Sequence, residues 1–236
     1  MPQSSAWEAA KAAGADGKVL AVADIFEGQA KRGKDLYGVP EEKCFSGFDA
    51  YLKAIETPDV NYVILATPPG FRPAFFKAAI DAGKHVFMEK PVAVDGPGCR
   101  IMYAAYEEAV KKNLKVAAGT QRRHQASYIE TIKRIHDGAI GKVHEVHAWT
   151  TASSRSNVNR SERPTDTPPV PEGLDWERWL CKSPYRPYHP DYTPYRWRSW
   201  WDFGSGTIGD LACHHLDPAF WALKLDQAPG FSVEAT

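Results

Sequence analysis

The 236-residue sequence has no excess of charge, no long apolar run and no paired cysteines, and each absence excludes a class of protein. Lys and Arg together number 29, as do Asp and Glu, so no net charge attracts nucleic-acid phosphates or anionic lipids. The longest apolar runs, such as residues 62–66, fall far short of the roughly 20 residues that span a bilayer. We therefore expect neither nucleic acid nor membrane among the partners.

The cysteines and the N-terminus indicate the compartment. The four cysteines, at positions 44, 99, 181 and 213, form no CxxC pair and are too sparse for a disulfide scaffold. No charged-then-apolar leader precedes Trp7. With 43% hydrophobic and 25% charged residues, the composition is that of a globular protein with a core of ordinary size. We expect a cytoplasmic protein.

Apolar runs alternate with helical patterns along the first 150 residues. The expected strands cover residues 18–24, 61–67, 85–88, 114–118 and 143–151. The expected helices cover residues 5–13, 29–37, 48–55, 73–82, 98–112 and 127–136. Strands that alternate with helices predict a parallel sheet with right-handed crossovers. The predicted fold class is α/β, with a doubly wound, Rossmann-like sheet.

One element of that fold is missing from the start of the sequence. Dinucleotide-binding sheets carry a glycine-rich GxGxxG turn between their first strand and first helix. No such turn, and no strand, precedes Ser5. Either the fold is of another type, or the chain begins inside it and the sheet lacks its first strand.

Polar residues follow each expected strand, at the edge of the sheet where doubly wound folds bind ligands. These residues are Asp24, Thr67 with Pro68, Glu89 with Lys90, and Gln121 with Arg122. A carboxylate such as Asp24 can accept hydrogen bonds from both hydroxyls of an adenosine ribose, and its charge disfavours a 2′-phosphate. This pattern favours NAD over NADP. A capping or solvated aspartate is an equally good interpretation.

Residues 176–201 hold five of the eight tryptophans, interleaved with tyrosines and arginines. Aromatic rings with arginine can line a sugar pocket. Ordinary packing beneath a loop explains them equally well. The preceding residues, 153–171, are rich in Ser, Thr, Asn and Pro and predict a long surface loop or an insertion.

Asp210, His214 and Asp217 follow a glycine-rich entry at spacings that place all three on one face of a helix. A carboxylate one turn before a histidine can fix its tautomer and raise its basicity, which suits a general base. A structural histidine is an equally good local interpretation. A metal pair is disfavoured because no third ligand accompanies it, so no metal is expected.

Five ordered motifs together resemble one family, the Gfo/Idh/MocA oxidoreductases, which includes inositol dehydrogenases and glucose–fructose oxidoreductase. The motifs are ATPP at 66–69, AGKHVFMEKP at 82–91, GTQRR at 119–123, GAIGKV at 138–143 and DLACHHLD at 210–217. The resemblance covers nearly the whole chain, and residues 153–171 match least.

The resemblance implies an NAD-dependent oxidoreductase that transfers a hydride between a sugar or polyol hydroxyl and nicotinamide. Lys90 then lies between nicotinamide and substrate, and His214 is the base that Asp210 orients. The implied cofactor-binding residues are Asp24, Thr67, Pro68, Glu89 and Lys90, and the implied substrate-binding residues are Gln121, Arg122, Asp210 and His214. An NAD-dependent glycoside hydrolase of the same family and a non-catalytic scaffold remain alternatives.

Relative to that family, the sequence starts after the phosphate turn and stops within the second domain. The expected domains are an N-terminally incomplete NAD(P)-binding domain at 1–120 and a C-terminally incomplete α+β substrate domain at 121–236. We therefore expect the chain to bind NAD weakly or not at all. Full-length relatives are expected to be homo-oligomers.

Overall fold

A computed structural model describes residues 14, 17–149, 162–230 and 232–234. The expected helix at 5–13 lies outside the described residues, as does the first part of the expected loop at 153–171. The part of that loop that is described, residues 162–171, contains no helix or strand, as predicted.

The first parallel ladder is short and is covered by two helices. Strand β1 (Val22–Asp24) pairs with β2 (Cys44–Ser46), a strand that the sequence pattern did not indicate, and β2 follows the single-turn η1 (Glu41–Lys43). Helices α2 (Glu27–Tyr37) and α3 (Ala50–Glu56) pack against both strands. A side chain at Gly33 of α2 would collide with Val22, so this glycine permits the close contact of helix and strand.

The second parallel ladder contains the aliphatic core. Its strands, in the order of pairing, are β3 (Tyr62–Leu65), β4 (His85–Met88) and β5 (Val116–Ala118). Helices α4 (Arg72–Asp81) and α5 (Gly96–Lys111) pack side by side against this ladder. Phe76 and Ile80 of α4 and Val86 and Met88 of β4 are all buried. The alternation of apolar runs and helices is therefore confirmed as an α/β fold with parallel strands.

The two ladders do not join among the described residues, and the doubly wound strand order explains why. In the order 3-2-1-4-5-6, the first strand separates the 3-2 pair from the 4-5-6 trio. The β1–β2 pair matches the 3-2 pair of this order, and the β3–β4–β5 trio matches the 4-5-6 trio. No strand within the described ranges pairs with both β1 and β3 to join the two ladders.

The second half contains only helices and irregular segments among its described residues. After the turn η2 (Gln121–His124) come α6 (Ala126–His136), α7 (Trp176–Trp179), η3 (Arg196–Ser199), α8 (Trp201–Gly204), α9 (Gly206–His215), α10 (Asp217–Ala222) and η4 (Leu225–Gln227). The strand expected at 143–151 is wrong over 143–149, which are irregular and mostly exposed. A strand requires a neighbour for its backbone groups, and no described segment supplies one.

The aromatic stretch forms a second core. Trp176, Trp179, Trp197 and Trp200 are each 8% exposed or less and pack with neighbouring aromatics into one cluster, which also contacts Ile25 and Phe26 beyond β1. Only Trp201, 70% exposed, faces outward. For Trp176, Trp197 and Trp200, ordinary packing is therefore the correct interpretation. Trp179 belongs to the same cluster but also lines a hollow together with Trp201 and Pro68.

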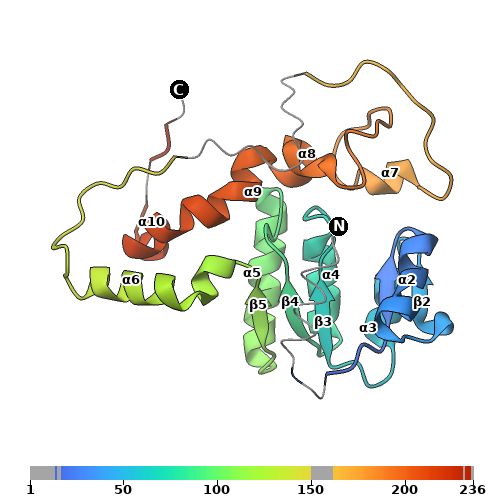
Figure 1. The fold of residues 1–236 in the computed structure, drawn as a ribbon, viewed down its shortest axis with the longest axis horizontal. Coiled ribbons are helices and arrows are strands. Elements are labelled where there is room, and N and C mark those ends of the chain that lie inside the picture. The colour runs from blue at the N-terminus through green and yellow to red at the C-terminus, as the bar shows by residue number, and fades with distance from the viewer. Residues whose placement is uncertain (1–13, 15–16, 150–161, 231, 235–236) are drawn as a thin grey trace.

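Helices α8 and α9 lie across the carboxyl ends of the second ladder (Figure 1). This places the glycine-rich entry and the Asp210–His214 pair above the residues that follow β4 and β5. None of the helices in the described ranges has the length and apolar character that crossing a membrane requires.

Candidate active site

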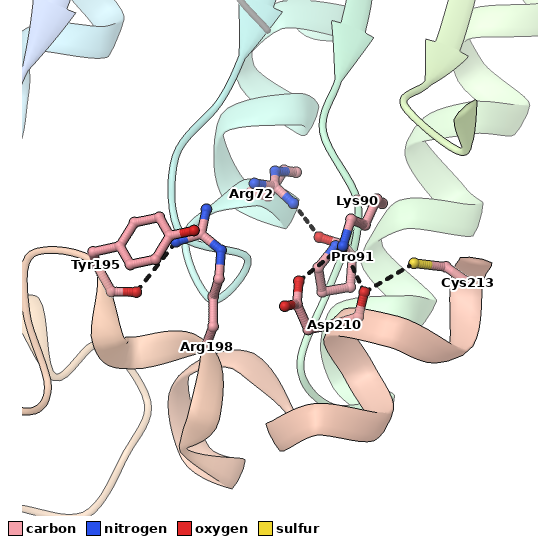
Figure 2. Close-up of polar contacts among 7 residues, drawn as sticks. All are labelled: Arg72, Lys90, Pro91, Tyr195, Arg198, Asp210 and Cys213. Atoms are coloured by element: carbon pink, nitrogen blue, oxygen red, sulfur yellow. Dashed lines mark hydrogen bonds and ion pairs between the residues drawn. The ribbon is translucent and has the colours of Figure 1, made fainter. Parts of the chain in front are cut away.

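The centre of the site is an ion pair between residues 120 positions apart in the chain. Lys90 follows β4, and its Nζ donates to Asp210 Oδ1 at 2.8 Å and to the Asp210 backbone carbonyl at 2.5 Å (Figure 2). The two side chains are only 17% and 14% exposed. Because the contact is shielded from water, it fixes helix α9 against the end of β4.

A buried arginine ties together the loops that follow β3 and β4. Arg72, at the start of α4, donates to the backbone carbonyls of Thr67 and Pro91. Burial lowers the pKa of Arg72 to about 10. Its side chain is 1% exposed, and its Nε has no partner within the described structure. Arg72 therefore positions Thr67 and Lys90 relative to each other, a role that the sequence pattern did not indicate.

His214 lies one turn beyond Asp210 on α9, as predicted, but no hydrogen bond joins the two side chains. Its Nδ1 is buried without a hydrogen-bond partner in the described structure, and the Asp210 carboxylate is bound to Lys90 instead. Burial, followed by the charges of Lys90 and Arg122, lowers the pKa of His214, although Asp210 opposes this. At neutral pH the imidazole is therefore uncharged and able to accept a proton.

Arg122 and Arg123, which follow β5, have different partners. Arg122 stacks over Tyr128 at 5.0 Å and acts electrostatically on His214, so it belongs to the site. Arg123 instead binds Asp217 through two hydrogen bonds of 2.8 Å each.

Gln121, which the sequence placed with the substrate-binding residues, is exposed. It makes no side-chain hydrogen bond within the described residues.

Asp217 does not share one continuous helix face with Asp210 and His214, contrary to the spacing argument. Helix α9 ends at His215, and Asp217 lies in the first turn of α10. The break has a local cause, since Pro218 has no backbone N–H to continue α9 and is favoured at the start of a new helix.

The expected cofactor residues fit a dinucleotide in part. Thr67 Oγ1 is buried with no hydrogen-bond partner in the described structure, so a ligand at the end of β3 would satisfy it. Asp24 ends β1, where its carboxylate accepts the Phe26 backbone N–H at 2.9 Å, and burial raises its pKa. Both interpretations of Asp24, ribose binding and capping, are compatible with this contact. Its described contacts are local and do not reach the Lys90–Asp210 pair.

Glycines 204, 206 and 209 have GxGxxG spacing and open α9, but their setting is not that of a phosphate turn. No strand precedes them, since α8 does. A side chain at Gly204 would collide with the backbone of Arg198, and one at Gly209 with Ser205. These glycines allow η3, α8 and α9 to pack closely.

Two groups that sequence reasoning missed also border the site. Arg198, on η3, lies within electrostatic range of Asp210 and Glu89. Figure 2 shows Arg198 on the same side of the site as Asp210. The Cys213 thiol contacts the Asp210 carbonyl at 3.4 Å. Arg198 could not be selected from the sequence, because it is one of several arginines in the aromatic stretch and only the folded chain shows which one lies near Asp210.

The site thus combines an ion-paired lysine and a threonine with an unpartnered hydroxyl, both following parallel strands, with an uncharged histidine on α9. Such a set can bind a hydroxyl, take its proton and stabilise negative charge on its oxygen. No group of three or more His, Cys, Asp or Glu residues in the described ranges is arranged to hold a metal ion.

Known proteins match this chain along most of its length. Its relatives include inositol 2-dehydrogenases from Gluconacetobacter diazotrophicus (30% identical over 170 residues, 72% of this chain and 48% of the relative) and Ralstonia nicotianae (33% over 171 residues, 71% and 48%). The chain therefore spans about half the length of these curated relatives. A myo-inositol 2-dehydrogenase structure from Lactobacillus plantarum superposes with a TM-score of 0.45 and 27% identity, over 54% of this chain and 36% of that one.

Two family models divide the sequence between them. Residues 2–118 match the model described as "Oxidoreductase family, NAD-binding Rossmann fold". Residues 129–236 match the model described as "Oxidoreductase family, C-terminal alpha/beta domain". Because both models come from the same family and together cover nearly the whole sequence, the chain belongs to the Gfo/Idh/MocA family of oxidoreductases.

Proposed function

We propose that the protein is an NAD-dependent oxidoreductase that transfers a hydride between a sugar or polyol hydroxyl and nicotinamide. The observation that carries this proposal is the convergence of Lys90, Asp210 and the uncharged His214 at the carboxyl ends of the strands. The division into a cofactor domain at 1–120 and a substrate domain at 121–236 would place this convergence where the two domains meet.

The proposed cofactor site uses residues that follow the strands. Asp24 would bind the adenosine ribose, and Thr67, Pro68 and Glu89 would border the nicotinamide end. The unpartnered Thr67 Oγ1 supports this assignment because a buried hydroxyl without a hydrogen bond is costly. When bound, NAD supplies the hydride acceptor, and the protein supplies placement and charge.

The chain's own groups would handle the proton and the charge. His214 would accept the proton of the substrate hydroxyl, for which its lowered pKa keeps it ready at neutral pH. Lys90 would donate to the same oxygen and stabilise the negative charge that develops there. Asp210 would hold Lys90 in place through the 2.8 Å contact, and Arg122 and Gln121 would bind the remaining hydroxyls.

An NADH absorbance assay tests this function. At saturating NAD, the protein should reduce NAD with at least one neutral or acidic polyol from a panel that includes myo-inositol. His214→Gln should lower the rate by about 10²- to 10⁴-fold. The control is His144→Gln, at an exposed position in the irregular segment after α6. A His214→Gln rate equal to that of the wild type would contradict the assignment.

The same assay separates the two alternatives. A glycoside hydrolase would release the aglycone from an aryl glycoside without net NADH. A scaffold would bind NAD or a polyol and show neither reaction. Either pattern would overturn hydride transfer to free polyol as the function.

A further inference from the structure

Arg198 is a half-buried cation without a carboxylate partner in the part of the chain that the structure describes. Its neighbour on η3, Arg196, binds Asp191 at 2.6 Å, and Arg186 binds Asp202. Arg198 has a single hydrogen bond, from Nη1 to the Tyr195 carbonyl at 3.2 Å. Its Nε and Nη2 groups, the edge that binds a carboxylate with two parallel hydrogen bonds, make none with the described residues.

Two aromatic rings hold this guanidinium in place. Its central carbon lies 4.2 Å from the ring centroid of Tyr195 and 4.2 Å from that of Trp197, which is itself buried. Figure 2 shows the side chain extending from η3 past Tyr195 in the direction of Arg72, with the Lys90–Asp210 pair to one side. Stacking orients a planar guanidinium while leaving its hydrogen-bonding edge free.

The charges around this edge do not balance. Asp210 and Glu89 act on Arg198, but Asp210 is bound to Lys90 and Glu89 also faces Arg72. The three cations Lys90, Arg72 and Arg198 thus share the two carboxylates of Asp210 and Glu89. An unpaired charge in a site partly shielded from water is costly, so the arrangement favours an anionic ligand.

We propose that Arg198 binds the carboxylate of the substrate, so that the preferred substrates are sugar or polyol acids rather than neutral polyols. This inference rests on the proposed function for its site and deepens it by naming the substrate class. In doubly wound folds the cofactor's pyrophosphate lies at the glycine-rich turn of the first strand. Arg198 instead lies on η3, next to α8 and α9, within range of Asp210.

A matched pair of ligands tests the proposal by isothermal titration calorimetry. D-gluconate and D-sorbitol differ in having a carboxylate or a CH₂OH group at one end of the same polyol chain. The wild-type protein should bind gluconate at least about tenfold more tightly than sorbitol, since a charge-assisted bidentate hydrogen bond is lost with sorbitol. Equal affinity, or no binding of either ligand, would overturn the proposal.

Variants locate that preference at one side chain. Arg198→Gln should remove the preference for gluconate while changing sorbitol affinity less than about twofold, and Arg198→Lys should keep part of it. The control is Arg178→Gln, because Arg178 also stacks on an aromatic ring, Phe48 at 4.9 Å, but lies on α7 and binds Asp49. A preference that survives both Arg198 substitutions would overturn the proposal, as would its loss in Arg178→Gln.

Two further ligands identify the source of the anion. If Arg198→Gln weakens binding of inorganic phosphate or NAD but not of gluconate, the anion belongs to a phosphate group and the substrate assignment is wrong. Failure of the proposed function gives a different result. If no polyol yields NADH but gluconate still binds through Arg198, hydride transfer is wrong and the anion site stands.

Discussion

Among the described ion pairs, those of Lys90 with Asp210 and of Arg123 with Asp217 connect residues that follow strands β4 and β5 to helices α9 and α10, and they differ in how the cation is held. Lys90 reaches Asp210 with one ammonium group, which also contacts the backbone carbonyl of the same residue. Arg123 binds Asp217 with two parallel hydrogen bonds and stacks over Trp221 at 4.6 Å. The first pair is also the better shielded, since the Lys90 side chain is 17% exposed and that of Arg123 is 34% exposed.

This difference suits the Lys90 pair to a catalytic role and the Arg123 pair to a structural role. An ammonium group has three donors and rotates freely, so Lys90 can keep Asp210 and donate its remaining proton to a ligand. The guanidinium of Arg123 is fixed by its fork and by the ring beneath it. We therefore expect the Lys90 pair to control activity and the Arg123 pair to control the docking of α10.

The largest expected effect tests the chemical side of this comparison. Lys90→Met should lower kcat/KM for polyol oxidation by about 10²- to 10³-fold, because the developing negative charge loses its nearest cation. Arg123→Met should change kcat/KM by less than about tenfold. Steady-state NADH kinetics measure both values. Lys84→Met is the matched control, since Lys84 is a half-buried lysine that donates to the Val60 carbonyl away from the site. Equal losses in Lys90→Met and Arg123→Met would remove the distinction.

The next effect concerns stability, for which the order should reverse. Arg123→Met should lower the free energy of unfolding by about 2 kcal/mol, because it leaves the Asp217 carboxylate, only 15% exposed, without its bidentate partner. Lys90→Met should cost less, since it also relieves an excess of cations around Asp210. Urea unfolding followed by circular dichroism measures both changes. A larger loss in Lys90→Met would contradict the docking role of Arg123.

The sequence placed both members of the Lys90 pair in the site but did not predict their contact, because it expected Asp210 to orient His214. Lys90 directly follows an apolar run that is buried in the sheet, and Asp210 and His214 are one helical turn apart. The contact joins the end of β4 to helix α9, so it depends on how the second half packs over the strand ends. The Arg123–Asp217 pair was not predicted, although Pro218 was a visible signal that Asp217 begins a new helix.

The remaining misses came from residues whose partners are distant in the chain. The segment at 143–149 has a strand-like pattern, but pairing decides whether a strand forms, and no described segment pairs with it. The tryptophans of the second core were compatible with a pocket or with packing, and their buried positions beside Phe26 depend on the tertiary fold. Composition alone could not separate these outcomes, because aromatic rings serve both purposes.

The smallest expected effect is on the pKa of His214. It is also the most selective, because Lys90 shifts this pKa and Arg123 does not. Burial lowers the pKa of His214 below the usual 6.5, and Lys90 and Arg122 lower it further. Arg123 is not among the groups that shift it. Lys90→Met removes a nearby cation and frees the Asp210 carboxylate, and both changes raise the pKa of His214. Arg123→Met should leave it unchanged.

Nuclear magnetic resonance titration of the histidine side chains measures this, with His214→Gln to assign the signal. The midpoint of His214 should move to higher pH in Lys90→Met and stay in place in Arg123→Met. The pH dependence of the free energy of unfolding should change accordingly. A histidine whose pKa is lowered by folding costs stability as the pH falls below its unfolded pKa, because the unfolded chain takes the proton first. Lys90→Met should therefore show a smaller loss of stability just below pH 6.5. Equal shifts in both variants would mean that Arg123 also acts on the site, and the two pairs would then differ only in strength.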